Sequence, residues 1–257
     1  METKLWFALA IAAGTLHAQD ARAVLQNASL AMGSPRTIQY SGTGMNAFFG
    51  QALLAGREWP RRQLTSYSRA INYEQKSSSE EFGFTQEVFG GQRQNAWVNG
   101  ERAWNVAASG AAAPQVAAAE ERQLQIWLTP HGFLKAALDA GNATVKSRKE
   151  DGKNLNVVTF TALGKYKVDG AIDAQGMVTR VETKVTNPVL GDMAVITTYG
   201  GYKDFSGVLV ASTTTQKAAG QEFSLTIDSV KVNEEIPADK FALPAEVKAL
   251  IAKGAAK

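Results

Sequence analysis

The chain has 257 residues, with 27 basic and 24 acidic side chains, a formal net charge of +3 and no cysteine. Charges of both signs are interspersed without a basic run of five or more, which argues against a nucleic-acid-binding protein. Because no disulfide can form, the stability of the fold has to come from its apolar core.

The first 18 residues have the pattern of a secretory signal peptide. Lys4 precedes the apolar stretch Leu5–Leu16, and Ala18 is a small residue at a suitable cleavage position. The stretch is shorter than the roughly 20 residues of a membrane-spanning helix, and no cysteine follows for lipid attachment. We therefore expect a periplasmic or secreted bacterial protein without a transmembrane anchor, in which residues 19–257 form a single domain. An uncleaved N-terminal anchor is the alternative.

A helix is predicted at the start of the mature chain, where Asp20 can cap it and apolar residues recur every three to four positions until Gly33. Three strands should follow, at residues 37–49, 61–73 and 80–88. Asn99-Gly100 favours a type I′ turn in a hairpin over Asn95–Val106. That register would place Trp97 opposite Arg102.

Two consecutive helices are predicted in the middle of the chain, at about residues 115–140. An alanine-rich linker, Gly110–Ala119, leads into the first, which runs to about Leu128. Thr129 can cap the second, Pro130 suits its first position, and Gly141 should end it. The pair contains too many apolar residues for a solvated loop, so we expect it to cover one face of a sheet.

The remaining chain alternates apolar and polar residues, as antiparallel strands with one covered face do. Asp151-Gly152 predicts a turn, and a slip of the apolar phase at Asp228-Ser229 predicts a β-bulge. A short helix should follow Pro244. The whole pattern predicts an α+β fold, mainly antiparallel β: a curved half-barrel sheet of about a dozen strands wrapped over helices.

Few residues are suited to catalysis. Beyond the signal, His131 is the only histidine, whereas a hydrolytic zinc site uses about three protein ligands, and no GxSxG motif is present. We expect His131 to lie at the surface or to cap a helix, and Glu80-Glu81 to be solvated on opposite faces of a strand. Gly90-Gly91 and Gly200-Gly201 lack a phosphate-binding motif and predict turns. The sequence therefore predicts no catalytic residue, no metal and no cofactor.

A half-barrel needs an apolar occupant on its concave face, either its own helices or a ligand. Aromatic side chains should line such a ligand site, because binding pockets are mostly apolar. The candidates are Trp104, Trp127, Phe133, Tyr166 and Tyr199. Core packing is the alternative for all five. The expected partner is an apolar or lipid-like small molecule, or a lipoprotein.

Two resemblances add to this reading of the residues. The order helix, strands, helix pair and long meander, with the tail VKVNEEIPADKFALP at Val230–Pro244, resembles the bacterial lipoprotein-carrier (LolA-like) half-barrel superfamily. This resemblance implies the half-barrel fold over nearly the whole mature chain.

The second resemblance is to the region preceding the catalytic domain of certain secreted metallo-β-lactamase-fold hydrolases. It is carried by TIQYSGTG from Thr37, ERQLQIWLTPHGFLKAAL from Glu121, NPVLGDM from Asn187 and YKDFSGV from Tyr202. In that family the zinc ligands come from a downstream HxHxDH motif, which this chain lacks. The resemblance implies an alternative function, a detached accessory domain that partners a separate hydrolase.

Overall fold

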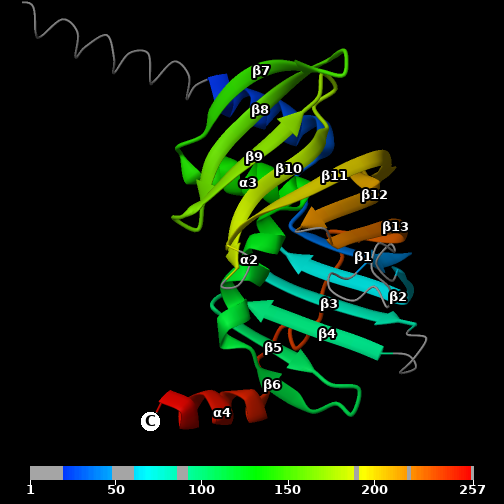
Figure 1. Ribbon diagram of the computed structural model, residues 1–257, viewed down its shortest axis with the longest axis vertical. Helices are drawn as coiled ribbons and strands as arrows, with labels where there is room; N and C mark the ends of the chain where they lie inside the picture. Colours follow the sequence, from blue (N-terminus) through cyan, green and yellow to red (C-terminus); the bar gives the residue numbers. More distant parts are fainter. Residues whose placement is uncertain (1–19, 48–60, 86–91, 188–190, 219–220, 256–257) are drawn as a thin grey trace, which may run out of the picture. The chain divides into compact units, whose positions relative to one another are not determined.

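The computed structural model describes residues 20–47, 61–85, 92–187, 191–218 and 221–255. The predicted signal peptide, Gly90-Gly91 and the far ends of two predicted strands lie outside these ranges. Within them, 13 strands form one antiparallel sheet in the order β6-β5-β4-β3-β2-β1-β13-β12-β11-β10-β9-β8-β7 (Figure 1). The predicted fold class and the approximate number of strands are confirmed. No helix in the described ranges has the length and apolar character that a membrane crossing requires.

The described chain divides into two compact units, so the single domain over residues 19–257 stays a prediction. The first unit contains the described residues up to Ser34 together with Trp127–Tyr199. It comprises a helix at residues 20–32, α3 (Pro130–Ala140), β7 (Thr144–Glu150), β8 (Lys153–Ala162), β9 (Tyr166–Ile172), β10 (Val178–Asn187) and the first part of β11 (Gly191–Phe205).

In this unit, α3 packs against β8 and β10. Thr129 caps α3 by accepting a hydrogen bond of 3.2 Å from the Gly132 amide, Pro130 occupies the first turn, and Gly141 ends the helix at φ 67°. The predicted helix signals are therefore confirmed. Phe133 is fully buried, with its ring against Gly170, where glycine leaves room for it.

The second unit contains the described residues of Pro35–Ile126 and Gly200–Lys257. It comprises β1 (Thr37–Ala47), β2 (Arg61–Asn72), β3 (Ser77–Phe84), β4 (Gln92–Asn99), β5 (Arg102–Val106), β6 (Ala112–Pro114), a 3-10 turn at Val116–Ala118, most of α2 (Ala119–Trp127), β12 (Val208–Ala218), β13 (Gln221–Val232) and α4 (Ala245–Ala255). The predicted alanine-rich linker thus contains a short strand, β6, beside which α4 packs.

The predicted hairpin of β4 and β5 is confirmed, but its predicted register is wrong: the two-residue turn lies one residue later, so the partner of each β4 residue shifts by two positions. Trp97 lies opposite Trp104, and Asn99 pairs with Arg102. The positive φ of 55° falls on Gly100, the first loop residue, where a type II′ turn takes glycine. Asn99 stays in the strand because its side chain accepts a hydrogen bond from the Ser77 hydroxyl and donates one to the Phe241 carbonyl, both 2.9 Å long.

Three further turn and bulge predictions have mixed outcomes. Asp151-Gly152 joins β7 to β8 as predicted. The β-bulge is also confirmed, since Ser41 pairs with Ser229 and the next pair involves Ile227. Gly200-Gly201 is not a turn but lies inside β11. Gly201 has a left-handed φ of 61°, and a Cβ atom on it would meet the Ser212 hydroxyl oxygen of β12, so the backbone conformation together with this contact explains the glycine.

Candidate functional site

Five aromatic side chains of the second unit form a continuous group, here called the aromatic cluster. Its members are Tyr40 on β1, Tyr67 on β2, Phe82 and Phe84 on β3, and Phe223 on β13. Ring centroids are 6.1 Å apart for Tyr40 and Tyr67, and 6.4 Å for Tyr67 and Phe82. They are 5.7 Å apart for Tyr67 and Phe223, and 6.1 Å for Phe82 and Phe84. Such spacings are within the range of favourable aromatic pairs.

Strand register explains why these rings meet. Tyr67 lies directly opposite Phe82, and Leu64 lies opposite Phe84. On the other side, Tyr67 is paired with Gly42, which presents no side chain to that face. A Cβ atom on Gly42 would lie 2.2 Å from the Thr226 carbonyl oxygen of β13, so the close approach of β1 and β13 requires glycine there.

The aromatic cluster has a buried base and a partly accessible upper layer. Leu64, Tyr67, Phe84 and Leu225 are at most 5% exposed and pack together. The partly buried side chains on this base are Tyr40, Phe82, Phe223 and Ile227. Apolar surface of this kind favours contact with an apolar molecule, because removing it from water is favourable.

Helix α2 lies on the same face of the sheet as the aromatic cluster. Arg69 is two residues beyond Tyr67 on β2, so both side chains point to one face. The Arg69 guanidinium donates a hydrogen bond of 3.2 Å to the Gln125 carbonyl of α2 and one of 3.3 Å to the Ser78 hydroxyl. Figure 1 shows α2 alongside these strands. The helix pair was predicted to cover one face of a sheet, and for α2 this prediction is confirmed by its contact with Arg69 of β2.

Polar groups border the aromatic cluster. The Tyr67 hydroxyl donates a hydrogen bond of 2.6 Å to the Glu80 carboxylate. Burial, and secondly the negative charge of Glu80, raise the pKa of Tyr67 well above its ordinary value. Burial by itself would lower the pKa of Arg69, but Tyr40 and Glu80 raise it, so the guanidinium stays charged. The prediction that Glu80 is a solvated charge is therefore only partly right, because the side chain is half-buried and its carboxylate accepts the Tyr67 hydrogen bond.

Glu81 points to the other face, as the strand alternation requires, but it is not simply solvated either. Its carboxylate lies 2.5 Å from the ammonium group of Lys240, and both side chains are 34% exposed. Lys240 also lies 5.6 Å from the centre of the Trp97 ring. This pair belongs to the packing around Trp97 and not to the aromatic cluster.

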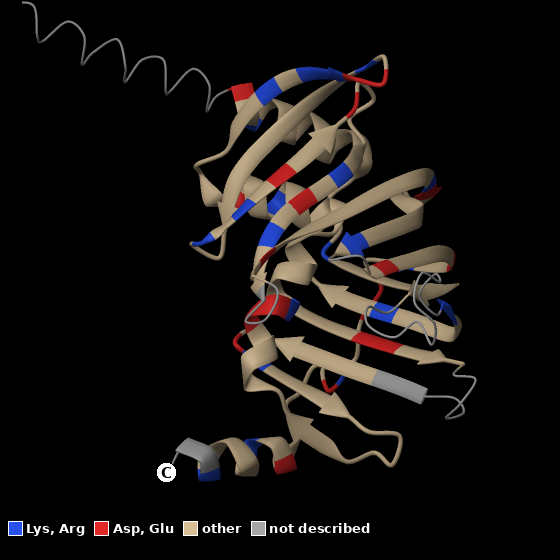
Figure 2. Ribbon diagram, in the orientation of Figure 1, with Lys and Arg blue, Asp and Glu red and all other residues tan. Residues whose placement is uncertain are grey.

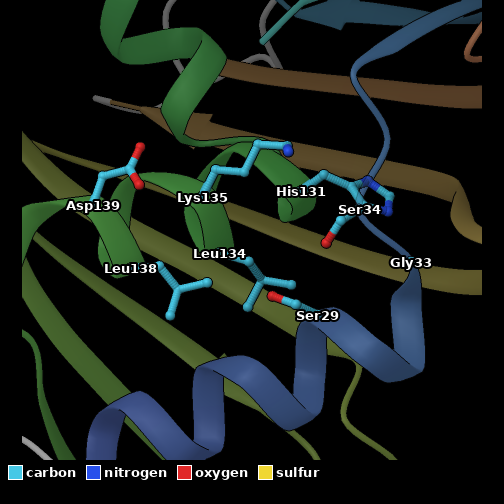
Figure 3. A pocket seen from close by; sticks show the side chains of 8 residues that line it. All are labelled: Ser29, Gly33, Ser34, His131, Leu134, Lys135, Leu138 and Asp139. Carbon is cyan, nitrogen blue, oxygen red and sulfur yellow. The ribbon is translucent and has the colours of Figure 1, made fainter. Parts of the chain in front are cut away.

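A second candidate site is a pocket of about 220 Å³ in the first unit, between the helix at residues 20–32 and α3 (Figure 3). Its lining residues are Ser29, Gly33, Ser34, His131, Leu134, Lys135, Leu138 and Asp139. Ligand pockets generally start at about 300 Å³. The pocket is too small to enclose a lipid-like molecule, so the aromatic cluster is the stronger candidate for an apolar ligand.

His131 lies in this pocket wall and is only 4% exposed, so the predicted surface position is wrong. Its Nε2 atom is 3.5 Å from the Met32 carbonyl oxygen. Burial lowers the pKa of His131 to about 4, and the ring is neutral at neutral pH. The side chain contributes to packing between two helices.

The structure does not bring the five sequence candidates into one site. Trp104 belongs to the second unit, where it is 2% exposed, stacks on Trp97 with ring centroids 6.4 Å apart, and packs against Ala112 and Val247. The other four belong to the first unit. None of the five lines the pocket or belongs to the aromatic cluster.

The four candidates of the first unit have different surroundings. Trp127 is 8% exposed at the end of α2, and Phe133 is fully buried. Tyr166 is partly buried, with the Lys165 ammonium 5.0 Å from its ring centre. The Tyr199 hydroxyl donates a hydrogen bond of 2.6 Å to the Leu128 carbonyl. The contacts of Phe133 are those of a core residue, whereas Tyr199 is partly buried, and a ligand-binding role for the five stays a prediction.

The aromatic cluster was missed because its members are spread over four strands far apart in the sequence. Aromatic and aliphatic residues at alternate positions in β3 and β13 were the available signal. That signal places Phe82 with Phe84, and Phe223 with Leu225, on one face of each strand. Only the order of strands shows that these faces are neighbours.

Neither a protein-family model nor a curated protein matches the chain. Several solved structures do. A LolA superfamily protein from Nitrosomonas europaea is 14% identical, with a TM-score of 0.55 over 87% of this chain and 97% of that one. A putative outer membrane lipoprotein-sorting protein domain from Vibrio parahaemolyticus is 12% identical, with a TM-score of 0.56 over 87% and 97%. A DUF1329 family protein from Desulfovibrio piger is 10% identical, with a TM-score of 0.55 over 88% and 97%.

These likenesses establish the fold. The chain is an open antiparallel sheet with helices that matches the LolA-like half-barrel, as the first resemblance in the sequence implied.

Proposed function

We propose that this chain is an exported, non-catalytic module that binds an apolar or lipid-like ligand at the aromatic cluster. The observation that carries the proposal is the partly accessible layer of Tyr40, Phe82 and Phe223 on a buried apolar base. A ligand that covers about 100 Å² more of this surface gains roughly 2.5 kcal/mol. Arg69 and Glu80, at the border of the cluster, would meet the polar part of such a ligand.

The fold supports the same proposal. One solved structure that shares it is described as a putative outer membrane lipoprotein-sorting protein domain. A lipid-modified or lipid-like partner in the periplasm agrees with the predicted signal peptide at residues 1–18. A non-catalytic role agrees with a mature sequence whose single histidine, His131, is buried between helices.

The proposal is tested by titrating the protein with N-phenylnaphthylamine, an apolar probe whose fluorescence rises on leaving water. We expect Phe82→Ala and Phe223→Ala each to weaken probe binding about tenfold, since each removes roughly 1.4 kcal/mol or more of contact. Both side chains are partly buried, so the variants should fold. Trp97→Ala is the matched control, because Trp97 is also partly buried but belongs to another cluster.

Thermal unfolding of all three variants shows whether they are folded. Absence of probe binding by the parent protein would refute the proposal. Equal binding by the parent, Phe82→Ala and Phe223→Ala would show that the ligand lies elsewhere, with Trp104, Trp127, Phe133, Tyr166 and Tyr199 as the next residues to substitute.

The second candidate function is an accessory domain of a separate metallo-β-lactamase-fold hydrolase, favoured by four sequence segments. Three of them lie on β1, on α2 with α3, and on β11 with β12. NPVLGDM lies partly outside the described residues. Co-purification from the native periplasm with a protein that contains HxHxDH would support this function, and the probe experiment does not depend on its outcome.

A further inference from the structure

The turn between β8 and β9 exposes a leucine in a backbone conformation that leucine rarely adopts. Leu163 has a φ of 49° and is 43% exposed. Gly164 follows at φ 74°, and the Lys165 amide closes the turn on the Ala162 carbonyl at 3.1 Å. A left-handed conformation is unusual for a bulky residue without a short polar side chain.

The chain itself shows what this kind of turn ordinarily takes. In the described residues, a left-handed pair with similar φ values also occurs in two hairpins whose loops have two residues, whereas the Leu163 loop has three. Asp151-Gly152 has φ values of 49° and 79°, and Ser206-Gly207 has φ values of 55° and 81°. Asp and Ser tolerate such turns because their side chains can hydrogen-bond the local backbone. Leu163 has no such group, so the geometry of the turn does not explain it.

The residues that follow Leu163 have a distinct composition. Lys165 and Lys167 are exposed on either side of Tyr166, and the Lys165 ammonium lies 5.0 Å from the Tyr166 ring centre. The Lys167 side chain is 72% exposed, with its ammonium 3.6 Å from the Asp169 carboxylate. Figure 2 shows basic residues at this turn. An aliphatic tip followed by a tyrosine between lysines is the composition of segments at a membrane–water interface.

We propose that the β8–β9 turn is a membrane-contact site. Leu163 inserts among the acyl chains of an anionic bilayer, Tyr166 lies at the level of the headgroups, and Lys165 and Lys167 contact lipid phosphates. A bilayer fits better than an acidic protein, because a single aliphatic tip lacks the roughly 1,000 Å² of surface that a specific protein interface needs. The contact is weak, reversible and sensitive to salt. It does not depend on which ligand the aromatic cluster binds.

The test is co-sedimentation of the mature protein with vesicles of phosphatidylethanolamine and phosphatidylglycerol. Leu163→Asn is the informative variant, because asparagine is favoured in the left-handed conformation and the turn should form at least as well. We expect this variant to lose binding about fivefold. Lys165→Gln combined with Lys167→Gln should lose it at least as much and reduce its salt dependence, since each lysine near an anionic surface contributes about a fivefold factor.

Ser206→Asn is the control for introducing asparagine at a left-handed turn position, since Ser206 has a φ of 55° in the two-residue turn between β11 and β12, and we expect it to bind like the parent. The proposal is overturned if the parent does not sediment with anionic vesicles, or if Leu163→Asn sediments as well as the parent. Capture of an acidic protein by the parent and by Leu163→Asn alike would also overturn it. Phenylnaphthylamine binding should be unchanged in Leu163→Asn, so failure here is distinguishable from failure of the ligand proposal.

Discussion

The contact between Phe133 and Gly170 provides a quantitative test of whether Phe133 is a permanent part of the core. A Cβ atom on Gly170 would lie 2.1, 2.4 and 2.6 Å from three carbons of the Phe133 ring. Carbon atoms in contact are normally about 3.5–4.0 Å apart, so the ring would have to move by more than about 1 Å. It has little room, because Phe133 is fully buried and its ring centre is 5.7 Å from that of Phe160.

We therefore expect Gly170→Ala to lower the free energy of unfolding by about 1–3 kcal/mol, as overpacking of a core does. Phe133→Ala should cost about 3–5 kcal/mol. In the double variant the new methyl group enters the cavity left by the ring, so Gly170→Ala should cost close to nothing there. The resulting coupling energy is about 1–3 kcal/mol, within the range for residues in contact.

Urea unfolding of the four proteins, followed by tryptophan fluorescence, measures this cycle. A cost of Gly170→Ala that is equal in both backgrounds would refute the reasoning. So would a cost below about 0.5 kcal/mol in the parent, the usual range for changes that disturb no packing. The predicted coupling would identify Phe133 as core and remove it from the residues proposed to bind a ligand.

Three further predictions concern stability. Gly100→Val should cost about 1–3 kcal/mol, because Gly100 has a φ of 55°, and Gly100→Asn should cost much less; thermal unfolding of both checks this. Arg122→Met should lower the free energy of unfolding, measured in urea, by about 2–3 kcal/mol, because the Arg122 guanidinium donates hydrogen bonds of 3.0 and 2.9 Å to the carbonyls of Trp97 and Trp104. Arg102 is exposed, so Arg102→Met should cost little. Between pH 6.5 and about 4 the unfolded chain binds a proton at His131 that the folded chain excludes. The free energy of unfolding should therefore decrease, by at most about 3 kcal/mol, as the pH is lowered through this range. His131→Phe should lack this part of the pH dependence. Parallel pH profiles of parent and His131→Phe would contradict the burial of that ring.

Much of the fold was predictable because local signals act over a few residues. The cap of α3 depends on Thr129 and its near neighbours, and the helix ends at Gly141 because glycine accepts a left-handed φ. The turn at Asp151-Gly152 and the bulge at Asp228 are similarly local, since each follows from residue types at adjacent positions. The strong alternation in β9 and β10 shows one covered face without showing what covers it.

The aromatic cluster could not be predicted in the same way. Tyr40, Tyr67, Phe82 and Phe223 are neighbours because β13 pairs with β1, β1 with β2 and β2 with β3. The hydrogen bond of Glu80 comes from the Tyr67 hydroxyl on the neighbouring strand, and the burial of His131 depends on a helix about 100 residues earlier in the chain. These contacts join residues distant in sequence, so no window along the chain contains both partners.

By itself, the sequence determined the fold class, the helix pair with the Thr129 cap of its second helix, most turns and the absence of the residues that a hydrolytic zinc site requires, because these follow from residue types and their local spacing. The tertiary structure decided which faces meet. It placed Asn99 in a strand and not in the turn, because the side chain of Asn99 bridges Ser77 and the Phe241 carbonyl. It also assembled the aromatic cluster from four strands, since in an antiparallel sheet the register, and not the sequence of any one strand, determines which side chains are neighbours.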